Sequence, residues 1–262
     1  MSNKIISVMQ PYFLPYIGYW QLIAIADVFV LLDDVNFIVR GYINRNNILV
    51  NGRAYLFSMP VAGASQNRLI RDTKLNFSSA ARKKLLKTIA VSYKKAPQFP
   101  VVFPLLESII YYPENDLTKF IQQSLVLVSG YLGLNTRFIL SSSMEKGEPQ
   151  NAQDRIIDIC LKIGGETYIN PPGGWSLYDP DEFRRSGLAL RFLRPGAISY
   201  TQFHHDFVPN LSIIDVLMFN TTGRISHYLR KYDLVEKDQV GPIKAGQTPE
   251  AGLIENGPEV EF

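Results

Sequence analysis

The sequence has almost no cysteine. Cys160 is the only one among 262 residues, so no internal disulfide can form, and no paired cysteine spacing indicates a metal site. A reducing compartment is the natural setting for such a chain, and we predict the cytoplasm. Cys160 lies in the apolar run 156–161, which favours a buried helical residue over a nucleophile.

Long apolar runs are also missing. The longest, residues 22–32, is interrupted by Asp27 and is much shorter than the roughly 20 residues that a membrane-spanning helix needs. Residues 1–5 have neither the apolar segment nor the small-residue cleavage site of a signal peptide. These absences predict a soluble protein that does not span a membrane.

Charge is sparse and unevenly placed. Charged residues make up 19% of the chain and apolar residues 46%, and the net charge is +3, a balance that supports a sizeable globular core. Residues 234–262 carry six acids and two lysines, a charge of −4, so residues 1–233 carry +7. A basic globular part predicts an anionic small ligand, such as a nucleotide or a sugar phosphate. A nucleic-acid partner is less favoured because the basic residues are not densely clustered.

Apolar periodicity predicts an α/β fold. Residues 4–8 and 28–32 have the pattern of strands, and residues 16–26 between them have helical spacing, so the three form a βαβ unit. The later elements alternate in the same way: strands 136–140, 166–169 and 188–192, with helices 151–163, 180–186, 211–219 and 224–232. We therefore expect an open, mostly parallel, Rossmann-like sheet with flanking helices.

The predicted α/β domain covers residues 1–233. It contains a helical insertion at about 75–135, with helices 78–92, 101–111 and 117–132. Residues 36–52 are expected to be irregular, and residues 53–59 to form a strand that Pro60 ends. From residue 234 onward periodicity is lost, which predicts a flexible acidic tail over 234–262.

The turn after the first strand is the first candidate ligand site, because open α/β sheets bind ligands where strands end. It reads Gln10-Pro11-Tyr12-Phe13-Leu14-Pro15-Tyr16-Ile17-Gly18-Tyr19. Gln10 can donate and accept hydrogen bonds, and Gly18 permits close backbone approach to a ligand. Hydroxyls and stacking faces are offered by Tyr12, Tyr16 and Tyr19. The competing interpretation is a rigid turn whose aromatic side chains pack into the core.

This layout resembles the nucleotidyltransferase-like fold, in which a His-x-Gly-His motif begins the helix after the first strand. The matching positions here read Tyr16-Ile17-Gly18-Tyr19. The glycine is kept, but both histidines, which stabilise phosphate charge during adenylyl transfer, are absent. Tyrosine can donate a hydrogen bond but brings no positive charge, so the analogy predicts fold more than activity.

A second group of polar residues follows the second strand. Asp33 and Asp34 end it, and we predict that they are catalytic, either orienting an amine or acting as general base. The loop beyond them holds arginines suited to bidentate binding of phosphate or carboxylate. Its predicted substrate-binding residues are Arg40, Asn44, Arg45 and Asn46. In the alternative interpretation, Asp34 caps a turn and the arginines form surface ion pairs.

Two further loops complete the predicted site. A strand runs into the Pro-Pro-Gly-Gly loop at 171–174, which indicates a second strand-end binding loop, although an ordinary tight connection would read the same way. The substrate-binding residues predicted from it are Asn170, Gly173, Gly174 and Tyr178. Near the last helices, Asn210 and Ser212 are predicted binding residues that can also cap a helix. His204 and His205 have no predicted partner, and Arg68, Arg71 and Lys74 are interpreted as a solvated face.

These motifs together resemble the WbqC-like family over about residues 5–231. The segments that carry the resemblance are residues 9–19, 33–37, 40–46, 168–171 and 209–215. The resemblance implies a bacterial or archaeal protein of surface-polysaccharide clusters, such as those for O-antigen or lipopolysaccharide. It also implies a glycine transferase that acylates an amino sugar.

Three functional hypotheses follow from the residues and the resemblance together. The first is a ligase that uses ATP, with Mg²⁺, to join glycine or another small acid to a nucleotide-linked amino sugar. The second is a transferase that takes the acyl group from a charged tRNA or a thioester without ATP. The third is a non-catalytic protein that binds sugar nucleotides or organises partner enzymes of the same pathway. No resident metal ligands are predicted.

Overall fold

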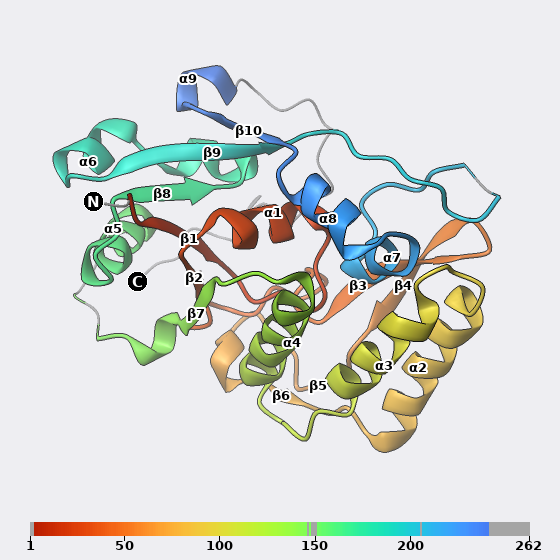
Figure 1. Cartoon of the computed structure of the whole chain (residues 1–262). Helices are drawn as coiled ribbons and strands as arrows, with labels where there is room; N and C mark the ends of the chain where they lie inside the picture. The colour runs from red at the N-terminus through yellow and green to blue at the C-terminus, as the bar shows by residue number, and fades with distance from the viewer. Residues whose placement is uncertain (1–2, 146, 148–150, 205, 241–262) are drawn as a thin grey trace.

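The computed structural model describes residues 3–145, 147, 151–204 and 206–240 (Figure 1). Within these residues, the central sheet has six strands: β1 (Ile5–Met9), β2 (Val28–Leu31), β7 (Arg137–Leu140), β8 (Thr167–Asn170), β9 (Ala189–Pro195) and β10 (Tyr232–Val235). They lie in the order β10-β9-β8-β1-β2-β7. All neighbours are parallel except β9 and β10. The predicted α/β fold with an open, mostly parallel sheet is confirmed.

The strand order creates a switch point beside β1. Counted along the chain, the six strands have the order 3-2-1-4-5-6 of a doubly wound sheet. The chain adds β2 and then β7 on one side of β1, and returns to add β8 on the other. In such sheets ligands bind outside the carboxyl ends of the strands at this reversal. The carboxyl ends of β1 and β8 are therefore the position where a ligand is expected.

Both faces of the sheet are buried, which explains why its central strands read as continuous apolar runs. Phe29 and Leu31 of β2 point to the same core as α1 (Ile17–Ile25) and α8 (Thr222–Leu229). Val28 and Val30 alternate to the opposite face and pack with α5 (Ala152–Lys162) and α6 (Pro180–Arg185). Figure 1 shows α1 and α5 on the two sides of the sheet.

The predicted helical insertion is present. It consists of α2 (Ser79–Tyr93), α3 (Phe99–Ile110) and α4 (Leu117–Leu132), which lie together below the sheet in Figure 1. The short elements of the chain are β5 (Val61–Ala62), η1 (Ile70–Asp72), β6 (Lys74–Leu75), η2 (Ser141–Ser143), η3 (Pro172–Leu177), α7 (Ile213–Phe219) and α9 (Lys237–Val240).

The prediction that residues 36–52 are irregular is wrong for their second half. Strand β3 (Arg45–Val50) pairs antiparallel with β4 (Arg53–Ser58). The two-residue turn between them is Asn51-Gly52, with φ of 49° and 73°, as type I′ hairpins require. The Asn-Gly pair was therefore a hairpin signal, which the polar composition of the preceding residues obscured.

The end of the chain also differs from expectation. Helix α8 ends at Leu229, and Tyr232 begins β10, which pairs with β9. The described fold thus continues past residue 233, through Val235 and then α9. Residues 241–262, most of the predicted tail, lie outside the described residues. Within the described ranges, no helix combines the length and apolar character needed to cross a membrane.

Cys160 should be chemically inert in the folded protein. It is fully buried on α5, and burial raises the pKa of its thiol to about 12. At pH 8 only about one thiol in 10,000 would be ionised, and the thiolate is the reactive form. We expect no reaction with Ellman's reagent in the native state and one thiol per chain in urea. Rapid labelling of the native protein would contradict the buried position.

Candidate active site at the carboxyl edge of the sheet

The turn that leaves β1 is held in a strained shape. Leu14 has φ of 45°, a left-handed conformation that costs a non-glycine residue on the order of 1–3 kcal/mol. Its buried carbonyl accepts hydrogen bonds from Asn46 Nδ2 at 2.8 Å and from Ser212 Oγ at 2.7 Å. Each such bond contributes about 1 kcal/mol, so the two together offset a strain of that size.

Backbone hydrogen bonds to the segments around Asn46 and Ser212 also fix the turn. Phe13 N donates to Ile43 O at 3.0 Å, and Ile213 N donates to Pro15 O at 2.9 Å. The Pro15 carbonyl also accepts from the indole nitrogen of Trp20 at 3.1 Å. The turn is therefore positioned by chain segments that are about 30 and about 200 residues away in sequence.

Several predicted binding residues have structural partners. Asn46 and Ser212 are buried and bind Leu14 O, while Asn44 Nδ2 donates to Met59 O at 2.8 Å. Arg45 Nε donates to Gly41 O at 2.8 Å. These side chains fix the hairpin and the turn. Their contribution to substrate binding stays a prediction.

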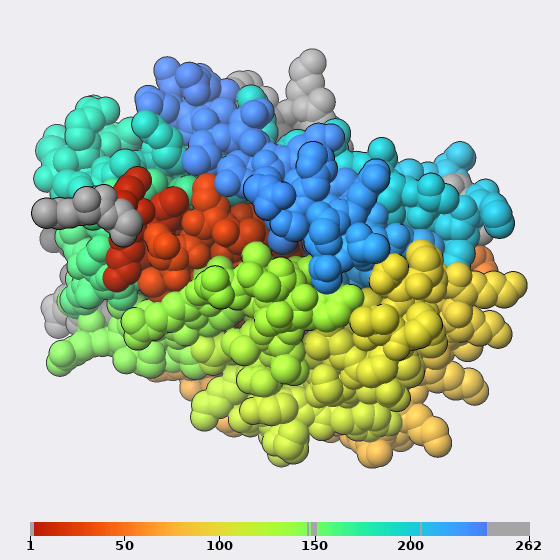
Figure 2. Space-filling model, viewed as in Figure 1, coloured from red at the N-terminus to blue at the C-terminus, as the bar shows by residue number. Residues whose placement is uncertain are grey.

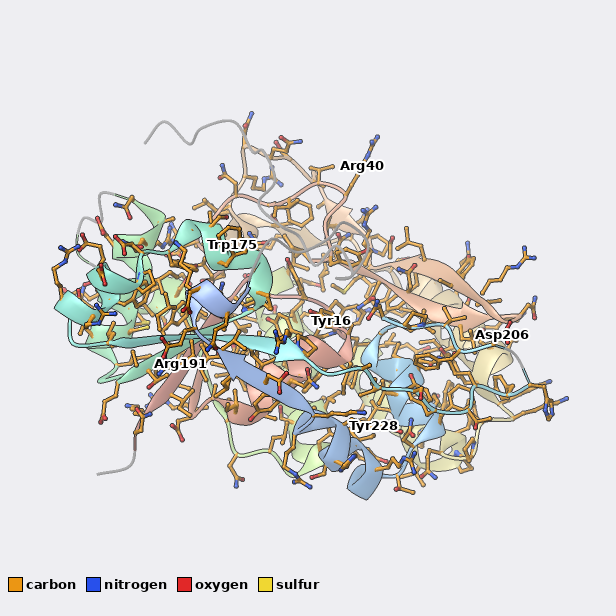
Figure 3. All side chains as sticks on the ribbon, turned by 90° about the horizontal axis from the view of Figure 1, so that it is seen from above. Tyr16, Arg40, Trp175, Arg191, Asp206 and Tyr228 are labelled. Carbon is orange, nitrogen blue, oxygen red and sulfur yellow. The ribbon has the colours of Figure 1, made fainter. Side chains whose placement is uncertain are left out.

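Arg40 and Asn210 are placed differently. Both are exposed and left-handed, with φ of 67° and 60°. In Figure 3 the Arg40 side chain points outward, away from Tyr16. Arg40 is close to Asp33 and Asp34 in sequence. Its side chain nevertheless lies away from the turn after β1.

The tyrosines of the turn contact its backbone and one another. Tyr19 is buried and donates its hydroxyl hydrogen to Gln10 O at 2.8 Å, and the centroid of its ring lies 5.5 Å from that of Tyr12. Tyr16 lies over Gly18, where an added Cβ would come within 2.5 Å of the Tyr16 ring. The atom that approaches Gly18 is thus a carbon of Tyr16, so the glycine makes room for that ring.

The electrostatic environment keeps these hydroxyls neutral. Burial raises the pKa of Tyr16 to about 12. Burial also raises the pKa of Tyr12, and the neighbouring hydroxyls of Tyr16 and Tyr42 raise it further. At neutral pH both Tyr12 and Tyr16 are therefore protonated and can donate hydrogen bonds, but they add no charge.

Gln10 carries the feature that most directly indicates a ligand. Its Oε1 atom is buried and has no hydrogen-bond partner among the described residues. A buried acceptor left without a partner costs about 1–3 kcal/mol, and most buried polar atoms in proteins have a partner. Gln10 directly follows the last residue of β1, at the switch point of the sheet.

Asn170 ends the neighbouring strand. The pairing of Ile6 with Tyr168 places Asn170 level with Val8 when the parallel register is continued, so its side chain and that of Gln10 emerge on the same face. Asn170 is 5% exposed, accepts from Tyr168 Oη at 2.9 Å and donates to Pro171 O at 3.2 Å. A Cβ at Gly174 would collide with its amide. Gly174 is thus needed to make room for Asn170.

The remaining residues of the 171–178 loop support this arrangement. Tyr178 is buried, and its hydroxyl lies 3.4 Å from that of Tyr168. Gly173 is half-buried within η3. The loop therefore places the Asn170 amide against a packed pair of tyrosines at the end of β8.

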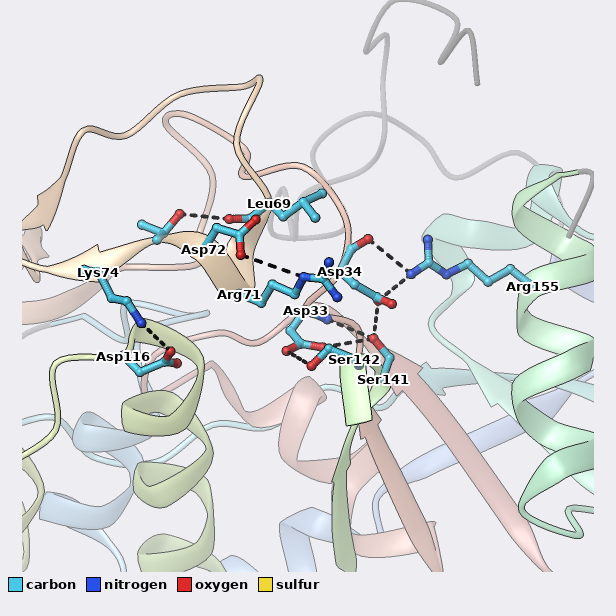
Figure 4. Close-up of polar contacts among 11 residues, drawn as sticks. Asp33, Asp34, Leu69, Arg71, Asp72, Lys74, Asp116, Ser141, Ser142 and Arg155 are labelled. Carbon is cyan, nitrogen blue, oxygen red and sulfur yellow. Dashed lines mark hydrogen bonds and ion pairs between the residues drawn. The ribbon is translucent and has the colours of Figure 1, made fainter. Parts of the chain in front are cut away.

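The ends of β2 and β7 are joined by Asp33 (Figure 4). Asp33 is 1% exposed, and its Oδ1 accepts from Ser142 N at 2.9 Å and its Oδ2 from Ser142 Oγ at 2.7 Å. The Ser141 hydroxyl lies within hydrogen-bonding distance of the Asp33 and Asp34 carboxylates. Both oxygens of Asp33 are thus used to connect the two strand ends.

Asp34 brings in a residue that the sequence did not indicate. Arg155 of α5 forms an ion pair with the Asp34 carboxylate and donates to Asp34 O at 3.2 Å. Burial lowers the pKa of the Arg155 guanidinium, the charge of Asp33 opposes this shift, and Arg71 adds to it. Arg155 Nε is buried without a partner among the described residues. Arg155 Nε is therefore a hydrogen-bond donor that lacks an acceptor among these residues. It lies near the end of β2, the strand that pairs with β1.

The carboxyl edge of the sheet therefore gathers polar residues that come from four strand ends, the turn after β1 and helix α5. These residues are Gln10, Tyr12, Tyr16, Asp33, Asp34, Ser141, Ser142, Arg155 and Asn170. In the described part of the chain, no three histidine, cysteine, aspartate or glutamate side chains lie close enough to hold a metal ion. Such a set is suited to binding a polar organic ligand through hydrogen bonds.

The two hydrogen bonds to Leu14 O should make the effects of mutating Asn46 and Ser212 energetically coupled. Either Asn46→Ala or Ser212→Ala leaves one hydrogen bond to the carbonyl, and we expect each to cost about 1–2 kcal/mol in urea unfolding. The double variant leaves the buried Leu14 carbonyl unpaired. Its loss of unfolding free energy should therefore exceed the sum of the two single losses by about 1 kcal/mol. Ser108→Ala, which removes an exposed bond to Leu105 O, is the control. Strict additivity would contradict this account.

Gly174 offers a second test of the site. Gly174→Ala should displace the Asn170 amide and destabilise the fold by about 1–3 kcal/mol, because the added methyl has no space. Gly130 lies inside α4 and has no atom within 4 Å of an added Cβ, so Gly130→Ala should be neutral or stabilising by up to about 1 kcal/mol. Thermal unfolding of both variants makes the comparison, and equal effects would refute the proposed crowding.

Comparison with known proteins places the chain in a family. The model of the WbqC-like protein family matches residues 10–227. An uncharacterized protein of Mycobacterium tuberculosis, Rv1507c, is 26% identical over 230 residues, which cover 87% of this chain and 98% of that protein. No solved structure matches the chain. The family match includes the turn after β1, both strand-end loops and α7, and the chain belongs to the WbqC-like protein family.

Proposed function

We propose that the protein binds a nucleotide-linked amino sugar at the switch point and transfers a small acyl group, such as glycine, to its amine. The observation that carries the proposal is the unpaired, buried Oε1 of Gln10 at the carboxyl end of β1. Doubly wound sheets bind nucleotide-type ligands at this position. A sugar hydroxyl or amine would supply the hydrogen that Gln10 Oε1 lacks.

The charge of the site supports an anionic ligand. Residues 1–233 carry most of the positive charge of the chain, and Arg155 Nε is a buried donor without a partner among the described residues. Guanidinium groups bind phosphate oxygens well because they donate from a planar fork. Arg155 is therefore our candidate for contact with the diphosphate, whereas the sequence predicted that Arg40 and Arg45 bind phosphate or carboxylate.

Amide formation requires proton removal from the attacking amine. The amine nitrogen attacks the carbonyl carbon of an activated acyl group, the C–N bond forms, and the bond to the carrier oxygen or sulfur breaks. A base accepts the proton of the amine nitrogen, and the carrier alcohol or thiol is the leaving group. Asp33 and Asp34 remain the proposed catalytic pair. Asp33 would fix the edge, since both its oxygens accept hydrogen bonds, and Asp34 would accept the proton.

The neutral turn favours a donor that is activated elsewhere. Tyr16 and Tyr19 occupy the positions where nucleotidyltransferase-like enzymes have histidines, and burial keeps both hydroxyls protonated by raising their pKa. They would bring no positive charge to a triphosphate. A thioester or charged tRNA donor therefore fits better than adenylation by ATP and Mg²⁺. The single, buried cysteine agrees with a cytoplasmic reaction.

The test combines binding with turnover. A UDP-linked sugar bearing a free amine is incubated with glycyl-tRNA, with a glycyl thioester, or with glycine, ATP and Mg²⁺, and the amide is detected by mass spectrometry. Release of AMP or pyrophosphate would identify the ATP route. Gln10→Leu should weaken binding of the nucleotide sugar about tenfold, the effect of one lost hydrogen bond. Gln66→Leu, in an exposed loop, is the control.

The outcomes separate the alternatives. Amide formation with a donor, reduced in Gln10→Leu, supports transfer at the switch point. Binding that depends on Gln10 but yields no amide from any donor contradicts transfer and leaves a non-catalytic sugar-nucleotide binding protein of the same pathway. Equal binding by wild type and Gln10→Leu contradicts the location of the site.

A further inference from the structure

Two adjacent cavities lie along α8, apart from the strand ends. One has a volume of about 630 Å³ and is lined by Arg224, His227 and Lys231 among others. The other has a volume of about 490 Å³ and is lined by Tyr200, Phe203 and Phe219 among others. The two share Thr221 and Arg224. Together they form a groove with a cationic end and an aromatic end, which we call the α8 groove.

The cationic end lacks balancing charge. Arg224 and His227 are spaced three residues apart and project from one side of α8, and Lys231 follows the end of the helix at Leu229. Neither cavity has an aspartate or glutamate among the described residues that line it. A bound anion would balance the positive charges of Arg224 and Lys231.

Arg224 is oriented before any ligand arrives. Its Nε donates to Tyr228 Oη at 2.9 Å, and its guanidinium carbon lies 5.6 Å from the centroid of the Tyr228 ring. The Tyr228 hydroxyl in turn donates to Ser199 O at 3.2 Å. This arrangement uses only Nε and leaves the two terminal nitrogens for a ligand. A guanidinium already held in place loses less conformational entropy on binding.

The aromatic end is equally well fixed. The rings of Phe203 and Phe219 pack edge to face with centroids 4.7 Å apart, and the Tyr200 ring lies 6.3 Å from that of Phe219. Tyr200 also donates its hydroxyl hydrogen to the buried Asp215 at 2.7 Å. Rigid aromatic side chains of this kind bind flat, apolar rings through stacking and edge contacts.

The α8 groove is distinct from the proposed active site. Its lining residues come from the segments 97, 199–203 and 219–231, and none comes from the strand-end loops. Gln21 Nε2 of α1 donates to Tyr228 O and Lys231 O, both at 2.9 Å, so α8 covers the outer side of α1. Figure 2 shows the helices at this end of the chain, in blue, at the molecular surface. In Figure 3 Tyr228 and Trp175 lie on opposite sides of the molecule.

We propose that the α8 groove is a second binding site, for a nucleotide. Arg224 and Lys231 would bind its phosphate groups, and the aromatic end would hold its base. The volume of each cavity suits a part of such a ligand, since small-molecule sites commonly have volumes of about 300–1,000 Å³. The site does not depend on the proposed transfer reaction, because it shares no residue with the switch point.

The experiment titrates UDP and inorganic pyrophosphate into Gln10→Leu protein by calorimetry. This variant weakens the switch point but leaves the α8 groove intact. Combining Arg224→Gln with Lys231→Gln should reduce UDP affinity at least about tenfold, since charge-assisted hydrogen bonds are lost. Arg230→Gln is the matched control, because Arg230 lies on the same part of the chain, bonds to Ser226 Oγ and does not line the groove. Arg224→Lys, which keeps the charge, should give an intermediate loss.

Photolabelling with 5-azido-UDP locates the bound base. Labelled peptides from residues 199–203 or 219–231 would support the proposal, together with weaker binding of pyrophosphate than of UDP. Labels confined to residues 10–19 or 170–178 would overturn it and leave the switch-point proposal standing. Equal affinity for pyrophosphate and UDP, or an equal loss in Arg230→Gln, would also overturn it. Unchanged unfolding temperatures confirm that the variants are folded.

Discussion

The site depends on one constraint, the fixed left-handed turn at Leu14. A leucine in this conformation is stable only when its surroundings hold it there, and here two side chains from distant segments bind the same carbonyl. The turn decides where the chain goes after β1. It leads the chain from β1 into α1 and keeps the Tyr19 hydroxyl on Gln10 O, with the Tyr12 ring against that of Tyr19. Without it, the end of β1 would have no defined shape.

This constraint explains why the characteristic motifs of the chain are scattered. The segments around Asn46 and Ser212 are far from residue 14 in sequence but meet it in space. They supply hydrogen bonds to the turn, whereas Gln10 supplies an acceptor atom that the fold itself does not use. The motifs thus divide into residues that hold the site in shape and residues that remain available to a ligand. Sequence order alone does not reveal this division.

Periodicity in the sequence was sufficient for the sheet but not for its polar edge. A continuous apolar run predicted β2, because both faces of this strand are buried, and short runs of β-type residues predicted β1 and β8. The edge strand β10 was missed because its burial is slight, and β3 was missed because its sequence is rich in asparagine. Arg155 was missed for a different reason. An arginine on an amphipathic helix usually faces solvent, and its partner Asp34 is 121 residues away. Contacts of that range are determined by topology, which local patterns do not encode.

The two unpaired buried atoms at the sheet edge restrict what can bind there. Gln10 Oε1 is an acceptor and Arg155 Nε is a donor, and each costs on the order of 1–3 kcal/mol while it lacks a partner. A ligand recovers that free energy only if it offers a donor at the end of β1 and an acceptor toward β2. An amino sugar attached to a phosphate has both, with its amine and hydroxyls as donors and its phosphate oxygens as acceptors. A purely anionic ligand would leave Gln10 unpaired, and a neutral sugar would leave Arg155 without a charged partner from the ligand. The proposed site would therefore favour a molecule that combines the two chemistries.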